Sequence, residues 1–121
     1  MDTLHMLNTA AVLFGIAAVG GVAMAIIRFR GADRPPSSFA MLHGLLAGAG
    51  LTLLLYAAAT TGVPGLATGA IVLFVIAALA GIWLNLSFHS KLLALPKGPI
   101  LIHGAVAAVG FVLLLLALNG A

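Results

Sequence analysis

The chain contains no cysteine and very little charge. Among its 121 residues are five Lys or Arg and two Asp or Glu, so only 6% of the chain is charged, against about a quarter of a typical soluble domain. The lack of cysteine excludes disulfides, thiolate catalysis, iron–sulfur clusters and covalently attached c-type haem. The lack of charge excludes a soluble globular domain, and a hydrophobic content of 64% excludes disorder. An integral membrane protein of one small domain remains.

Four apolar segments are each long enough to cross a bilayer as a helix. They cover residues 7–27, 39–59, 66–88 and 100–118, and a hydrocarbon core of about 30 Å needs about 20 helical residues. Helices are expected because a backbone that faces lipid must satisfy its own hydrogen bonds. We therefore predict an all-α fold in which residues 1–121 form a single four-span membrane domain, a four-helix bundle built from two tandem helical hairpins.

All five positive charges lie in or beside two of the three connections between these segments. Arg28, Arg30 and Arg34 belong to the first connection, and Lys91 and Lys97 to the third. By the positive-inside rule, these connections should lie in the cytoplasm and both termini outside it, with the bacterial inner membrane as the expected location. The formal net charge of +3 therefore reflects topology, and no nucleic-acid partner is expected.

The second half of the chain repeats the first half at a shift of 60 residues. The shift places the His-Gly pair that begins at His43 on the one that begins at His103, although the chain has only four histidines. We interpret the match as a duplicated helical hairpin, with repeats at about residues 8–61 and 68–121. Two spans per copy predict parallel copies related by a two-fold axis along the membrane normal.

Histidines are the remaining candidates for functional side chains within the predicted membrane helices. The predicted helix interiors hold no Asp, Glu, Lys or Arg, so carboxylate proton relays and carboxylate-coupled export are not expected. His43 and His103 fall about one turn inside the second and fourth segments, at matching depth.

Residues four and seven positions further along share the face of each histidine, and these steps span about 6 and 10 Å. The residues that follow on these faces are Ala47 and Gly50 in one segment and Ala107 and Gly110 in the other. The first and third segments also offer matched small residues, Ala17, Ala18 and Gly21 against Ala77, Ala78 and Gly81.

This layout resembles the b-type membrane cytochromes, in which opposed histidines on different helices ligate haem iron and glycines let the ring pack closely. The resemblance covers the four helices and implies one haem b, with His43 and His103 as the metal ligands. It implies a cofactor slot lined by Ala47, Gly50, Ala107 and Gly110, and propionates that reach basic residues such as Arg28 and Arg30 at the cytoplasmic end. The implied function is electron transport, with quinone or a partner complex exchanging electrons. The chain has no catalytic machinery of its own, so an enzyme activity would belong to a complex.

Two alternatives stay open. Small residues in membrane helices are often packing surfaces, which favours a non-redox accessory or structural subunit of a larger complex or a homo-oligomer. A His-based transporter of metal ions or small solutes is the second alternative. His89 adds a third histidine at the same end, or a quinone partner together with Asn85 and Ser87. For His89 and His5 we favour a plain polar role near the membrane surface.

Overall fold

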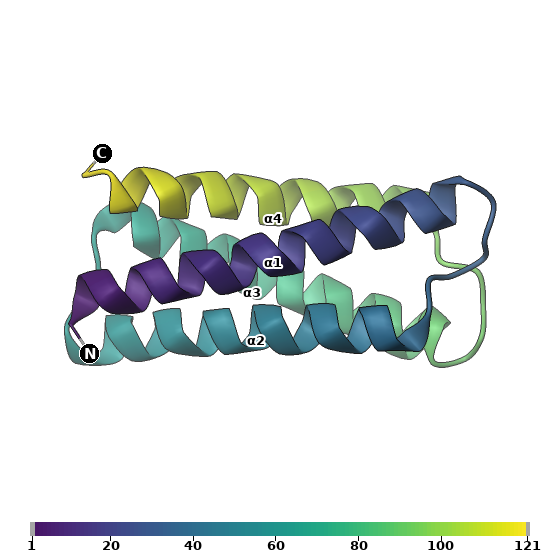
Figure 1. Cartoon of the computed structure of the whole chain (residues 1–121), viewed down its shortest axis with the longest axis horizontal. Coiled ribbons are helices and arrows are strands. Elements are labelled where there is room, and N and C mark those ends of the chain that lie inside the picture. The colour runs from purple at the N-terminus through teal and green to yellow at the C-terminus, as the bar shows by residue number, and fades with distance from the viewer. Residues whose placement is uncertain (1, 121) are drawn as a thin grey trace.

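The computed structural model describes residues 2–120, and it consists of four long helices that run side by side (Figure 1). The helices are α1 (Thr3–Phe29), α2 (Ser37–Thr60), α3 (Gly65–Leu84) and α4 (Lys97–Leu118), and the π-helical turn η1 (Asn85–His89) continues α3. Residues 2–120 contain no strand. All four helices, with η1 counted as part of the third, are long and apolar enough to cross a membrane. The prediction of an all-helical chain with four apolar helices is confirmed.

Local chemistry sets where the helices begin and end. The Asp2 side chain caps α1 by accepting a hydrogen bond of 2.8 Å from the His5 backbone N–H. Each of the other three helices begins directly after a proline, Pro36, Pro64 or Pro96, whose fixed φ and missing N–H suit a helix start. At Gly31, after α1, φ is +118°, a backbone conformation that other residues rarely adopt.

The helices form a closed bundle of two hairpins. α1 packs most extensively on α2 and α3 on α4, and further contacts join α1 to α4 and α2 to α3. This order of neighbours places α1 diagonally opposite α3, and α2 opposite α4. Both described chain ends lie at one end of the bundle, called here the terminal end, and the connections 30–36 and 90–96 lie at the other, the loop end (Figure 1). The loop end thus carries the basic residues of the chain.

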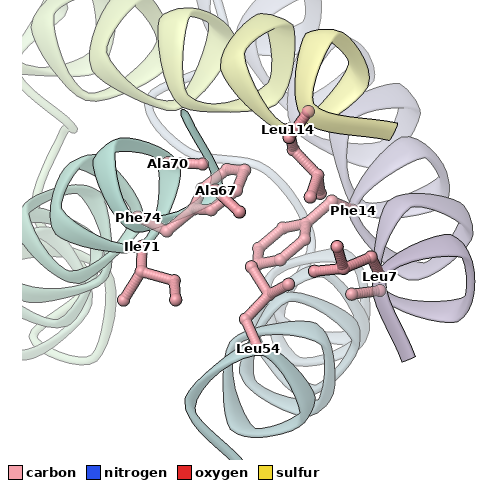
Figure 2. Packing of buried hydrophobic residues seen from close by; sticks show 10 residues of the cluster. Leu7, Phe14, Leu54, Ala67, Ala70, Ile71, Phe74 and Leu114 are labelled. Carbon is pink, nitrogen blue, oxygen red and sulfur yellow. The ribbon is translucent and has the colours of Figure 1, made fainter. Parts of the chain in front are cut away.

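The hydrophobic core lies in the terminal half of the bundle, and Figure 2 shows how its side chains pack together. Its centre is a pair of stacked rings, Phe14 and Phe74, with centroids 3.8 Å apart and planes within 4°. Glycines permit this approach, because a Cβ at Gly50 would lie 2.9 Å from the Phe14 ring and one at Gly110 would lie 3.3 Å from the Phe74 ring. The buried residues of this core are Leu7, Ala10, Phe14, Leu54, Ala67, Ala70, Ile71, Phe74, Leu114 and Ala117.

Candidate functional site

A pair of histidines faces each other across the loop half of the bundle. α2 carries His43 and α4 carries His103, and their ring centroids are 6.2 Å apart with the planes at 70°. Both side chains are half-buried. The two residues singled out from the sequence repeat therefore meet between diagonally opposite helices.

Each imidazole packs against a glycine on the neighbouring helix of its own hairpin. A Cβ at Gly21 of α1 would lie 3.1 Å from His43 Cε1, and a Cβ at Gly81 of α3 would lie 3.1 Å from His103 Cε1. Such distances are tighter than ordinary van der Waals contact, so even an alanine would require the ring to move. Gly21 and Gly81 are functional candidates that the sequence showed as matched small residues without revealing what they face.

The two histidines differ in their hydrogen bonding. His43 Nδ1 lies 2.7 Å from the backbone oxygen of Ala17. A carbonyl oxygen only accepts, so Nδ1 carries the proton and donates, which leaves the lone pair of the neutral ring on Nε2. His103 Nδ1 is buried and has no acceptor at full hydrogen-bond geometry within residues 2–120, but the backbone of Ala77, the counterpart of Ala17 in α3, lies close enough to act on the ring as a weaker acceptor.

The spacing of the rings suits one metal centre held between them. Two imidazoles that share a metal on opposite sides, with metal–nitrogen bonds of about 2.0–2.1 Å, place their ring centres roughly 6.3 Å apart. The observed separation is 6.2 Å. Within residues 2–120 no group of three or more His, Cys, Asp or Glu side chains is placed to hold a metal ion.

The small residues that follow the histidines lie at two levels. Ala47 and Ala107, one turn along, are half-buried. Gly50 and Gly110, about 10 Å along the axis, contact the stacked Phe14 and Phe74 rings. The stacked phenylalanines therefore lie next to the histidine pair on the side of the terminal end. A role of Gly50 and Gly110 in binding a cofactor stays a prediction.

The basic candidates lie at the loop end. Arg28 is half-buried; its Nε donates to the Leu95 carbonyl at 2.8 Å and its Nη1 to the Ala32 carbonyl at 3.2 Å. Arg30 is exposed. Arg28 joins the two loops and carries a positive charge close to the histidine end of the bundle, whereas Arg30 faces outward.

His89 has a structural role that the sequence did not indicate. Its side chain is 7% exposed, and Nε2 donates to the Pro35 carbonyl at 2.8 Å, which ties η1 to the first loop. Asn85 is exposed and Ser87 is half-buried on the same turn. The repeat gave no signal for this contact, because Phe29 stands at the equivalent position. His5 is exposed in the first turn of α1, at the terminal end of the bundle.

Comparisons of the chain with protein-family models, with curated proteins and with solved structures gave no significant match. The functional assignment consequently depends on the geometry of the histidine pair and on the chemistry of the residues around it.

Proposed function

We propose that the protein is a membrane b-type haem protein that carries electrons, with one haem ligated by His43 and His103 near the cytoplasmic side. The observation that carries the proposal is the pairing of these two imidazoles on diagonally opposite helices with centroids 6.2 Å apart. His43 and His103 would hold the haem iron, and the porphyrin itself would supply its remaining ligands, so two imidazoles from the chain would suffice.

The residues around the pair favour a neutral, flat, metal-containing group. Neutral imidazole is less costly to bury in a membrane than a carboxylate ligand. The bond from His43 Nδ1 to the Ala17 carbonyl leaves Nε2 free, and metal-ligating histidines commonly make an outer hydrogen bond of this kind. Gly21 and Gly81 keep the flanking helices close to the ring edges.

Haem, when bound, supplies a one-electron redox centre whose potential the protein tunes. His43 and His103 would hold it in the loop half, where Arg28 lies half-buried between the loops and would offer positive charge to the propionates. By the positive-inside rule, the basic loops support a cytoplasmic location for this end and an outside location for the termini, in a bacterial inner membrane. Exchange of electrons with quinone or with a partner subunit completes the proposed role.

The test is the absorption spectrum of the protein purified in detergent from haem-replete cells. We expect one haem per chain and a sharp α band after reduction. His43→Ala and His103→Ala should each abolish the low-spin spectrum, whereas His5→Ala should leave it unchanged. A colourless protein would refute the proposal, and copurification with other membrane chains would then support the accessory-subunit alternative.

The same ring spacing favours a second candidate, a single metal ion held by the two imidazoles in a metal transporter. Metal analysis of the purified protein separates the two functions. One equivalent of zinc or copper without porphyrin, lost in the His43→Ala variant, would support the metal-ion site.

A further inference from the structure

An open hollow lies between the two connections at the loop end of the bundle. Its volume is about 620 Å³, within the range of about 300–1,000 Å³ that small-molecule sites occupy. We propose that this hollow binds the headgroup of an anionic phospholipid, with Arg34 and Ser37 contacting the phosphate. The proposal does not depend on the haem, because the histidine pair does not line the hollow. The lining includes Ile27, Asp33, Arg34, Pro36, Ser37 and Leu92.

A contact between the two hairpins holds the Arg34 guanidinium at the hollow. Arg34 Nη1 donates to the Leu92 carbonyl at 2.9 Å, and both residues belong to the lining. A guanidinium carries several N–H donors, so this bond leaves others for a phosphate, which the planar group can bind through two parallel hydrogen bonds. Ser37 also lines the hollow, and its hydroxyl can donate one more. The hollow thus combines a positive charge with the donors that a phosphate group requires.

The other walls of the hollow are apolar, which favours a lipid over a free phosphate ion. Ile27 and Pro36 contribute apolar surface from the first hairpin, and Leu92 contributes it from the second. Leu92 and its neighbour Leu93 are 69% and 50% exposed. Apolar side chains beside a phosphate-binding group suit the glycerol and upper acyl chain of a phospholipid, whereas inorganic phosphate would gain nothing from them.

The position of the hollow along the bundle matches the headgroup layer of a membrane. α1 has 27 residues and is therefore about 40 Å long, close to the thickness of a bilayer that includes its headgroup layers. Ile27 lies near the end of α1, and Ser37 begins α2. The hollow consequently opens where these two helices leave the hydrocarbon core and reach the phospholipid headgroups.

The charge of the loop end selects an anionic headgroup. This end carries all five Lys and Arg residues of the chain but only one acid, Asp33, so positive charge remains even though Asp33 lines the hollow. Basic groups at a membrane surface attract anionic lipids. The repeat places Leu93 and Ala94 at the positions of Asp33 and Arg34, so the charged lining belongs to the first hairpin. One lipid per chain is therefore expected.

The test is native mass spectrometry of the full chain in detergent, with phosphatidylglycerol as the probe. Phosphatidylcholine, phosphatidylethanolamine and inorganic phosphate are added separately as competitors. We expect one phosphatidylglycerol per chain and about 10-fold weaker binding in Arg34→Gln, because hydrogen bonds between charged groups contribute at least that factor. Arg30→Gln removes the same charge from an exposed residue outside the lining, and should weaken binding less than about 2-fold.

A second pair of variants tests the hollow with Arg34 in place. Asp33→Asn should strengthen phosphatidylglycerol binding about 3-fold, because it removes the carboxylate and keeps the backbone carbonyl that accepts from the Leu95 N–H. Asp2→Asn is the matched control. It makes the same change in net charge at the terminal end, asparagine caps a helix as well as aspartate does, and lipid binding should stay the same.

Three results would overturn the proposal. Equal weakening in Arg34→Gln and Arg30→Gln would show a general attraction of lipid to the basic end without a defined site. A preference for phosphatidylethanolamine that Asp33→Asn abolishes would assign the hollow to a zwitterionic headgroup. Displacement of the lipid by an equal concentration of inorganic phosphate would assign it to a soluble phosphate.

Discussion

The terminal and loop halves of the bundle are packed in different ways. The terminal half centres on the stacked rings of Phe14 and Phe74, and the fully buried large side chains Met6, Leu54 and Leu114 all lie there. In the loop half, the side chains that meet on the axis are His43 and His103, both half-buried. Matched positions of the two hairpins thus supply close apolar packing at one end and a pair of imidazoles at the other.

Glycines in the two halves of the bundle make room for different side chains. In the terminal half, Gly50 lets an aromatic ring of the same hairpin approach the axis; in the loop half, Gly21 lets an imidazole do so. A glycine-rich helix face in a membrane protein therefore does not by itself indicate a cofactor. What distinguishes the two halves is the chemistry of the side chain that the glycine admits.

The largest loss of stability is expected when a bulky side chain replaces a glycine in the terminal half. Gly50→Leu puts a Cβ 2.9 Å from the Phe14 ring, whereas a Cβ at Gly48 would meet nothing from elsewhere in the molecule within 4 Å. We expect Gly50→Leu to destabilise the fold by about 3 kcal/mol, the upper range for overpacking, and Gly48→Leu to have little effect. Unfolding monitored in detergent tests this, and equal stability of the two variants would show that the Phe14 contact is unimportant.

Removing an aromatic ring from the same half should destabilise the fold less than Gly50→Leu does. Phe14→Ala leaves a cavity beside Phe74, but the unfolded helices remain in lipid, so the usual transfer of apolar surface from water contributes little. We therefore expect about 2 kcal/mol, below the 3–5 kcal/mol typical of water-soluble cores. Phe39, 44% exposed, provides the control, because Phe39→Ala should leave stability unchanged. A similar loss in both variants would contradict the central role of the stacked pair.

In the loop half, adding a single methyl group should affect haem binding more than the stability of the fold. Gly21→Ala places a Cβ 3.1 Å from His43 Cε1, while a Cβ at Gly20 would meet nothing within 4 Å. The displaced ring should weaken the Ala17 hydrogen bond and lower haem affinity by about 10-fold. Haem titration of Gly21→Ala beside Gly20→Ala checks this, and indistinguishable affinities would remove Gly21 from the site.

The smallest effect concerns the link between η1 and the first loop. His89→Ala removes the donor to the Pro35 carbonyl and should cost about 1 kcal/mol, the usual net contribution of one hydrogen bond. The reduced spectrum should stay unchanged, because His89 lies outside the histidine pair. Exposed Arg30 offers the control: Arg30→Ala should not affect stability. A changed α band in His89→Ala would instead assign His89 to the haem site.

The sequence predicted much of the helical frame because apolar length, proline and glycine determine it locally. The pairing of His43 with His103 was also anticipated, since a two-fold repeat brings equivalent residues together on its axis. The stacking of Phe14 on Phe74 was not, because in a membrane helix apolar residues face both lipid and core and their pattern does not separate the two faces. The contact of His89 was missed because it depends on the path of a loop far away in the chain.

The hydrogen bonds at the loop end have a consequence for how the chain assembles. The Leu95 N–H donates to the Asp33 carbonyl at 2.9 Å, and Arg34 Nη1 donates to the Leu92 carbonyl at 2.9 Å. Both bonds join one hairpin to the other, and neither uses the short connection 61–64 between α2 and α3. The two hairpins are thus joined at the loop end by bonds that do not depend on the connection between α2 and α3. A chain cut within that connection would keep these inter-hairpin bonds, and halves produced separately in one membrane would have the contacts to reassemble.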